Sequence, residues 1–172
     1  MERIKGQVLS EAIVAMGIIT IGVLGMAGFL SRAISEGRYI ADQTTAVNLA
    51  AEGIEIAKNI LDGNALKDNV PWNYGFNEEG FYEVDFESSS LGAPLGKTEN
   101  QGDLRNLKVK KIGDSEFYSY SGDTDTTFKR SVQIEYVLNR AYQIRVTSKV
   151  YWAARGNRLN NVSLSSDMYY WR

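Results

Sequence analysis

Cysteine and histidine are both absent from the sequence. Their absence excludes disulfide bonds, thiol nucleophiles, zinc sites built on these side chains and every catalytic triad that depends on an imidazole base. The lack of cysteine leaves the compartment open, because it suits the cytosol and the exterior equally well. An exported form of the chain would have to be held together by packing alone.

A strong charge of either sign is also missing. The chain of 172 residues carries 19 lysines and arginines against 21 aspartates and glutamates, a net charge of -2. This balance provides no general attraction for nucleic acid or for acidic lipid, so we expect no direct nucleic-acid binding. The length suits one domain, which can bury roughly two-thirds of its unfolded surface.

The most prominent feature of the sequence is an uncharged apolar run over residues 12–30. A helix of that length spans about 28 Å, close to the hydrocarbon thickness of a bilayer. Arg3 and Lys5 precede the run, and within the first six residues only Glu2 opposes them, so we expect the N-terminus in the cytoplasm and the rest of the chain outside. A secretory signal peptide and a plain single-pass anchor are two interpretations of such a run. A third interpretation uses the residues in front of it.

Those residues are a short basic leader, MERIKG, which ends at Gly6 and is followed by QVLSE with a single acid at Glu11. This segment resembles the cleavage and methylation segment of type IV prepilins and pseudopilins. The resemblance implies that a prepilin peptidase in the membrane cuts between Gly6 and Gln7, and that the new amino terminus is N-methylated. It also implies that Glu11, the fifth residue after the cut, aligns the subunits during assembly. Gln7 departs from the family, which usually has phenylalanine at that position.

Helix geometry also links Glu11 to the new amino terminus. Gln7 and Glu11 lie one turn apart, so cleavage leaves an ammonium and a carboxylate at one end of an apolar helix. Two unit charges about 4 Å apart attract by about 4 kcal/mol at an effective dielectric of about 20. An incoming subunit could therefore pair its amine with Glu11 of a subunit already in the fibre and set the axial register. The alternative is that Glu11 lies unpaired in the lipid headgroup layer, favoured by the helix dipole.

A helical period continues beyond the apolar run. Apolar residues recur every seven positions with alanines between them, which predicts a narrow packing face made of Ile40, Val47, Ala50, Ile54, Ala57 and Leu61. We expect the helix to run from about Gln7 to Leu61 and to stop at residues 62–64, where Gly63 suits a C-cap. A two-stranded coiled coil is the rival interpretation, but the stripe covers too few heptads and we favour packing against the chain's own sheet.

The rest of the chain predicts strands. Three alternating stretches near the C-terminus indicate an antiparallel meander, with apolar positions at Val132, Ile134, Tyr136 and Leu138, then Tyr142, Ile144, Val146, Val150 and Trp152, then Val162, Leu164, Met168 and Tyr170. Turns are expected at residues 139–141 and 155–157. Residues 64–127 are rich in turns, with weaker strand candidates at residues 82–86 and 107–112 on either side of a surface loop.

The expected fold class is α+β. A long N-terminal helix, with a membrane half and an amphipathic half, packs on a C-terminal antiparallel β-sheet. The arrangement is pilin-like, and the final strands also resemble those of minor pilins.

Two smaller features have more than one interpretation. Residues 123–127, DTDTT, look like part of an aspartyl phosphotransferase motif and could offer carboxylates to calcium, but we expect an exposed turn there, and no metal or cofactor. Tyr118, Tyr120, Tyr169 and Tyr170 suit an adhesive aromatic surface and, equally, ordinary strands.

The resemblance implies a precursor in four parts: a leader over residues 1–6, a membrane and assembly helix over 7–30, its amphipathic continuation over 31–62 and an exported β-rich domain over 63–172. The expected function is that of a non-enzymatic structural subunit, a minor pilin or pseudopilin, of a type IV pilus or a related type II secretion-like filament. Its expected partners are other pilin subunits, the prepilin peptidase and the inner-membrane assembly platform. It would reside in the cytoplasmic membrane before assembly and in the extracellular filament afterwards. The alternative is a single-pass anchored extracellular binding module that does not polymerise.

Overall fold

The computed structural model describes residues 2–137, 142–154 and 158–171, with side chains from Gln7 onward. The chain divides into two compact units, Met1–Ala41 and Asp42–Arg172. A single helix, α1 (Glu2–Ala65), supplies the first unit and the beginning of the second.

The first unit is helical and exposes its apolar side chains on all sides. Ile18 and Leu24, for example, are both 67% exposed. The hydroxyls of Ser10 and Thr20 donate hydrogen bonds to backbone carbonyls of the preceding turn, at 2.9 and 2.7 Å. Such bonds satisfy polar side chains inside the helix, which lipid requires because it offers no partner of its own. By length and composition, α1 is apolar and long enough to cross a membrane.

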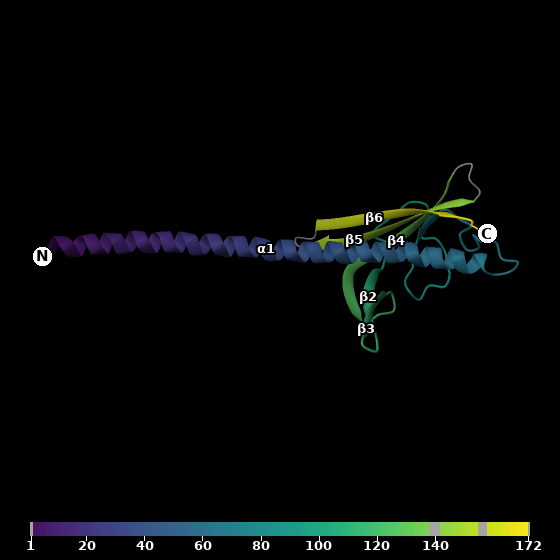
Figure 1. Ribbon diagram of the computed structural model, residues 1–172, viewed down its shortest axis with the longest axis horizontal. Coiled ribbons are helices and arrows are strands. Elements are labelled where there is room, and N and C mark those ends of the chain that lie inside the picture. The colour runs from purple at the N-terminus through teal and green to yellow at the C-terminus, as the bar shows by residue number, and fades with distance from the viewer. Residues whose placement is uncertain (1, 138–141, 155–157, 172) are drawn as a thin grey trace. The chain divides into compact units, whose positions relative to one another are not determined.

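The second unit combines residues 42–65 of α1 with an antiparallel sheet (Figure 1). Within the part of the chain that the structure describes, the strands are β1 (Gly80–Tyr82), β2 (Asn106–Ile112), β3 (Ser115–Ser119), β4 (Thr124–Tyr136), β5 (Gln143–Ala154) and β6 (Arg158–Tyr169). Their order across the sheet is β3-β2-β4-β5-β6, and β1 also pairs with β4. Side chains of α1 and of the sheet share both core clusters, so the expected α+β arrangement of helix on sheet is confirmed.

The predicted C-terminal meander is confirmed. β4, β5 and β6 pair consecutively, with Val132 opposite Ser148 and Val150 opposite Val162. Because successive side chains of a strand point to opposite faces, the predicted apolar positions line one side of these strands. The turns predicted at residues 139–141 and 155–157, and Leu138, lie outside the described residues.

Several local predictions were wrong. Strand β3 was not expected; it forms a hairpin with β2 around Gly113, whose φ of 62° favours glycine. Residues 124–127, expected in an exposed turn, begin β4 instead, because Thr124 pairs with Val109. The strand expected over residues 82–86 ends at Tyr82. Three tyrosines expected on the core side are exposed because they lie at or beyond strand ends: Tyr136, Tyr142 and Tyr170.

The helix ends slightly later than predicted. α1 continues to Ala65, so Gly63 lies within the last turn and is not a cap. The backbone N–H of Leu66 donates to the carbonyl of Asp62 at 3.1 Å. The buried amide of Asn64 donates to the carbonyl of Tyr74 at 2.7 Å. These bonds satisfy groups at the helix end and tie it to the following segment.

The core consists of two apolar clusters, and each contains residues from α1 and from the sheet. The first is made of Ile56, Ala57, Leu61, Phe76, Tyr82, Val84, Leu91, Val132, Ile134, Ile144, Val146 and Met168. The second is made of Ala46, Leu49, Ala50, Leu107, Phe128, Val150 and Trp152. The helix therefore covers the sheet along two successive patches.

Buried carboxylates fasten the long connection between β1 and β2. Asp85 accepts hydrogen bonds from the hydroxyl of Ser119 at 2.8 Å and from the N–H of Tyr120 at 3.1 Å. Burial by itself raises the pKa of Asp85, but these donors and others outweigh it and hold the pKa below its usual value. Further along, Glu99 accepts a hydrogen bond from Lys149 at 3.1 Å. These contacts help to attach the connection to the sheet.

Candidate functional site

The residues expected to act in cleavage and assembly lie in the first turns of α1. Gly6 and Gln7 are consecutive helical residues. Gln7 and Glu11 lie one turn apart on the same side of the helix. The Glu11 side chain is exposed and has no hydrogen bond or ion pair with any other residue whose side chain the structure describes. This carboxylate is therefore available to a cation from outside the chain.

An open apolar surface surrounds Glu11. Val8, Val14 and Ile18 are each more than 60% exposed. Farther along the helix, a methyl group added at Gly22 or Gly25 would have no atom within 4 Å. These glycines are not required for packing within the chain, and they leave room for a second helix to approach closely.

The predicted packing face is only partly the one that α1 uses. Ala50, Ala57 and Leu61 are buried, and Ile54 packs half-buried against the first cluster. Val47 is 36% exposed, and Ile40, in the first unit, is 61% exposed. The physical reason is the helical period: a strict seven-residue repeat drifts by about 20° per heptad on a straight helix. Positions spaced by sevens thus rotate away from the face, and the buried side is completed by Ala46, Leu49, Gly53 and Ile56.

A buried arginine lies between the two core clusters. The side chain of Arg130 in β4 is fully buried. Its guanidinium donates to the carbonyl of Leu49 in α1 at 3.0 Å and to the carbonyl of Val84 at 3.0 Å. It also forms an ion pair with Glu52 at 3.1 Å. One cation therefore links the helix, the central strand and the segment after β1, and its burial is tolerated because its donors are paired.

Gly53 of α1 lies opposite this arginine. A Cβ placed on Gly53 would be 2.4 Å from the Oγ of Ser148 and 3.1 Å from the Cδ of Arg130. Helix and sheet are thus too close at this point for any side chain. The Oγ of Ser148 is buried and has no hydrogen-bond partner among the described residues. Glycine, serine and arginine together form a polar layer across the core.

Sequence reasoning did not identify this polar layer, although a signal for Arg130 is present. Arg130 shares the period-two phase of Val132 and Ile134, which the alternation places on the helix-facing side. A charged residue at a helix-facing position of a strand indicates either that the strand lies at the edge of the sheet or that the charge forms a buried ion pair. Its partners, Glu52 and the Leu49 carbonyl, lie 78 and 81 residues away in the sequence, so the alternation alone does not indicate them.

The other chemical candidates do not form a site. The described residues contain no group of three or more aspartate or glutamate side chains that could hold a metal ion. Asp123, the first acid of the motif, is exposed and lies just before β4, not at the end of a buried apolar strand. Asp125 in β4 pairs at 3.3 Å with Lys108, so neither acid has the surroundings of a phosphotransferase nucleophile.

Comparison of the chain with protein-family models, with curated proteins and with solved structures finds no match.

Proposed function

We propose that this chain is a structural subunit, a minor pilin or pseudopilin, of a type IV pilus or a related type II secretion-like filament. A prepilin peptidase removes residues 1–6, and the subunit then enters the filament through its N-terminal helix. The β-rich unit faces outward. The chain itself catalyses no reaction.

The observation that carries the proposal is the exposed carboxylate of Glu11, the one acid among residues 7–30, on a helix stretch whose large apolar side chains are all exposed. Neither lipid nor the described part of the chain satisfies that charge. A neighbouring subunit can do so with the ammonium that cleavage after Gly6 exposes, one helical turn away on its own chain. The same contact would cover apolar surface on both helices and fix their axial offset.

Glu11→Ala tests the alignment role. We expect the variant to be cleaved normally but to be lost from sheared surface filaments, because the pairing charge is gone while the leader is unchanged. Glu36→Ala is the matched control, since it removes an acid from the same helix beyond the apolar run. Both are measured by immunoblotting of filament and membrane fractions.

The mass of the chain extracted from membranes tests the cleavage. Loss of residues 1–6 supports the filament subunit. An intact Met1, together with absence of the chain from filaments, would instead support an anchored binding module that does not polymerise. Normal incorporation of Glu11→Ala would contradict the role of Glu11.

A further inference from the structure

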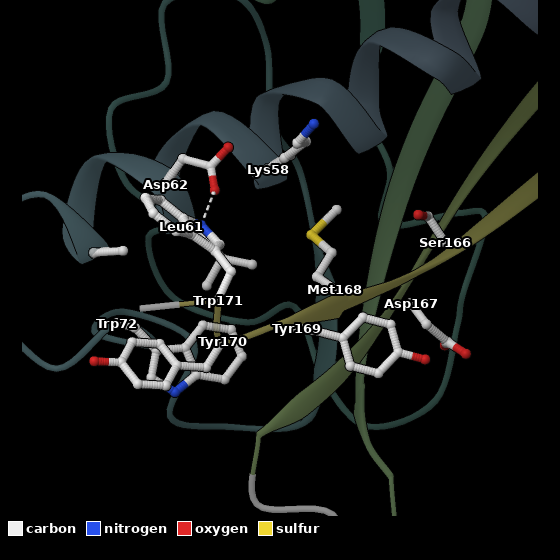
Figure 2. Close-up of a pocket in the computed structure, with 11 residues that line it drawn as sticks. Lys58, Leu61, Asp62, Trp72, Ser166, Asp167, Met168, Tyr169, Tyr170 and Trp171 are labelled. Carbon is white, nitrogen blue, oxygen red and sulfur yellow. Dashed lines mark hydrogen bonds between the residues drawn. The ribbon is translucent and has the colours of Figure 1, made fainter.

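A hollow of about 290 Å³ lies in the second unit between the last turns of α1 and the end of β6 (Figure 2). Its lining includes Leu61 of the helix, Trp72 of the following segment, and Met168, Tyr170 and Trp171 at the C-terminal end of the sheet. Ligand pockets typically measure about 300–1,000 Å³ and are lined mainly by apolar and aromatic side chains. This hollow lies at the lower end of that range and suits a small ligand.

The aromatic side chains of the hollow are held in place and are also open to solvent. Trp72 and Tyr170 pack against each other with ring centroids 5.7 Å apart. The indole N–H of Trp171 donates to Asp62 at 3.1 Å, the contact drawn as a dashed line in Figure 2. Even so, Trp171 is 62% and Tyr170 40% exposed. Because the hydrogen bond of Trp171 uses the ring edge, it fixes the ring without occupying its faces.

The charges of the hollow cancel. Lys58 and Asp62 both come from α1 and carry opposite signs. Asp167 is paired with Arg145 through two contacts of 2.8 and 3.0 Å. The lining contains one cation and two carboxylates, and Arg145, which lies outside the lining, balances the second carboxylate. The surroundings of the hollow are therefore neutral, yet they keep hydrogen-bond donors and acceptors beside the aromatic rings.

We propose that this hollow binds a neutral sugar ring, as a free hexopyranoside or at the end of a glycan. A pyranose has one face of C–H bonds, which packs on the negative face of an aromatic ring, and a rim of hydroxyls that both donate and accept. Trp171 and Tyr170 supply the rings, Asp62 accepts from hydroxyls, and Lys58 and Ser166 donate to them. A quaternary ammonium fits less well, because Lys58 would repel it and the carboxylates of Asp62 and Asp167 already accept hydrogen bonds from Trp171 and Arg145. This inference does not depend on the proposed assembly into filaments.

The test uses the full chain in lipid nanodiscs, since detergents with sugar headgroups would compete. The probes are methyl glycosides of glucose, galactose, mannose and N-acetylglucosamine, with glucuronate and choline for comparison. Binding is followed by saturation-transfer NMR and by tryptophan fluorescence.

We expect saturable binding of at least one neutral glycoside. Its affinity should change less than about twofold between roughly 0.05 and 0.5 M salt, because salt does not screen the binding of a neutral ligand. Binding to an array of glycans with neutral or acidic termini then shows whether the hollow takes the end of a glycan or only a free sugar.

We expect three single variants, Trp171→Ala, Tyr170→Ala and Asp62→Ala, each to lower the affinity about tenfold or more, which corresponds to loss of one ring contact or charged hydrogen bond. Tyr74→Ala is the matched control: its side chain is also 62% exposed but does not line the hollow, and we expect unchanged affinity. The near-UV circular dichroism of buried Trp152 reports whether each variant is folded. Failure of every neutral glycoside to saturate, stronger binding of choline or glucuronate, or unchanged affinity in Trp171→Ala would overturn the proposal. None of these outcomes bears on filament assembly, which is measured separately.

Discussion

The two stretches of α1 on either side of Ala41 differ in which side chains they leave exposed. Before Ala41, large apolar residues are exposed around the whole circumference, as at Ile18 and Leu24. After it, one side of the helix is buried against the sheet, with Ala46, Ala50 and Ala57 fully inaccessible. The first stretch is apolar on all sides, whereas the second is an ordinary amphipathic helix.

Exposed apolar side chains in the two stretches of α1 therefore need different surroundings. Ile40 and Ile18 are exposed to a similar degree, 61% and 67%. Ile18 belongs to a continuous apolar run, which needs lipid or other helices around it. Ile40 lies one helical turn from Glu36, Gln43 and Thr44 and can remain in water. The following predictions test the two stretches separately.

Arg130→Met should have the largest effect on the second stretch. It removes the one cation that binds the carbonyls of Leu49 and Val84 and pairs with Glu52, and we expect a loss of about 3–5 kcal/mol in unfolding free energy. Urea unfolding followed by tryptophan fluorescence measures it. Arg145→Met is the matched control: its pair with Asp167 is partly exposed to solvent, so the loss should be much smaller than in Arg130→Met. Equal losses in the two variants would contradict the role assigned to Arg130.

Ile18→Lys should have the largest effect on the first stretch. A lysine near the middle of a membrane helix costs about 3 kcal/mol of insertion free energy, so we expect membrane retention to fall by roughly 100-fold. Carbonate extraction of membranes measures the retained fraction. Ile40→Lys changes a side chain of similar exposure outside the apolar run and should leave retention unchanged. If both variants stay fully in the membrane, the run is not the anchor.

Gly53→Ala should have a smaller effect on the helix–sheet contact. The added methyl group would overlap Ser148, which we expect to cost about 1–2 kcal/mol after the gain in helix propensity. Gly63→Ala in the same helix meets no atom within 4 Å and should stabilise the protein by up to about 1 kcal/mol. Combining Gly53→Ala with Ser148→Ala should recover part of the loss, as thermal unfolding would reveal. If the double variant is no more stable than Gly53→Ala, overlap with the Ser148 hydroxyl is not the cause of the loss.

Acid should weaken the second unit gradually. The folded-state pKa of Asp85 is lowered, whereas the unfolded value is about 3.9. Its contribution to stability is therefore present above about pH 4 and is lost as the pH falls through the folded-state pKa. Asp85→Asn should make unfolding free energy less dependent on pH in that range, as measured by urea titrations at successive pH values. Ser119→Ala, which removes one hydrogen-bond donor, should move the acid loss to higher pH.

Much of the fold was predictable because it depends on local periods. The apolar run, the alternation in β4, β5 and β6, and the helix over residues 42–65 are each visible within a short window of sequence. The short strand β3 was missed because Ser115–Ser119 has little apolar character and is defined by pairing with β2. The exposure of Val47 was missed because heptad spacing was applied to a straight helix.

The candidate functional residues also differ in whether the sequence pattern could indicate them. Glu11 was identified from its position relative to Gly6 and the apolar run, which are neighbours in sequence. Arg130, Gly53 and Ser148 were not, since the contact between them joins positions far apart in the chain. The aromatic hollow joins residues 58–72 to residues 166–171 and was only hinted at by Tyr169 and Tyr170.

By itself, the sequence determined that one end of this protein is a membrane-length apolar helix bearing a lone carboxylate, and that the other end folds as an antiparallel sheet. Those properties follow from hydrophobicity and backbone period, which act between near neighbours. Only the tertiary structure decided that a fully buried arginine separates two core clusters, that helix and sheet touch at Gly53, and that aromatic residues surround a hollow beside Asp62. These three features depend on which residues, far apart in the sequence, pair with a buried charge or fill the same space. The pattern of residues along the sequence does not specify those partners.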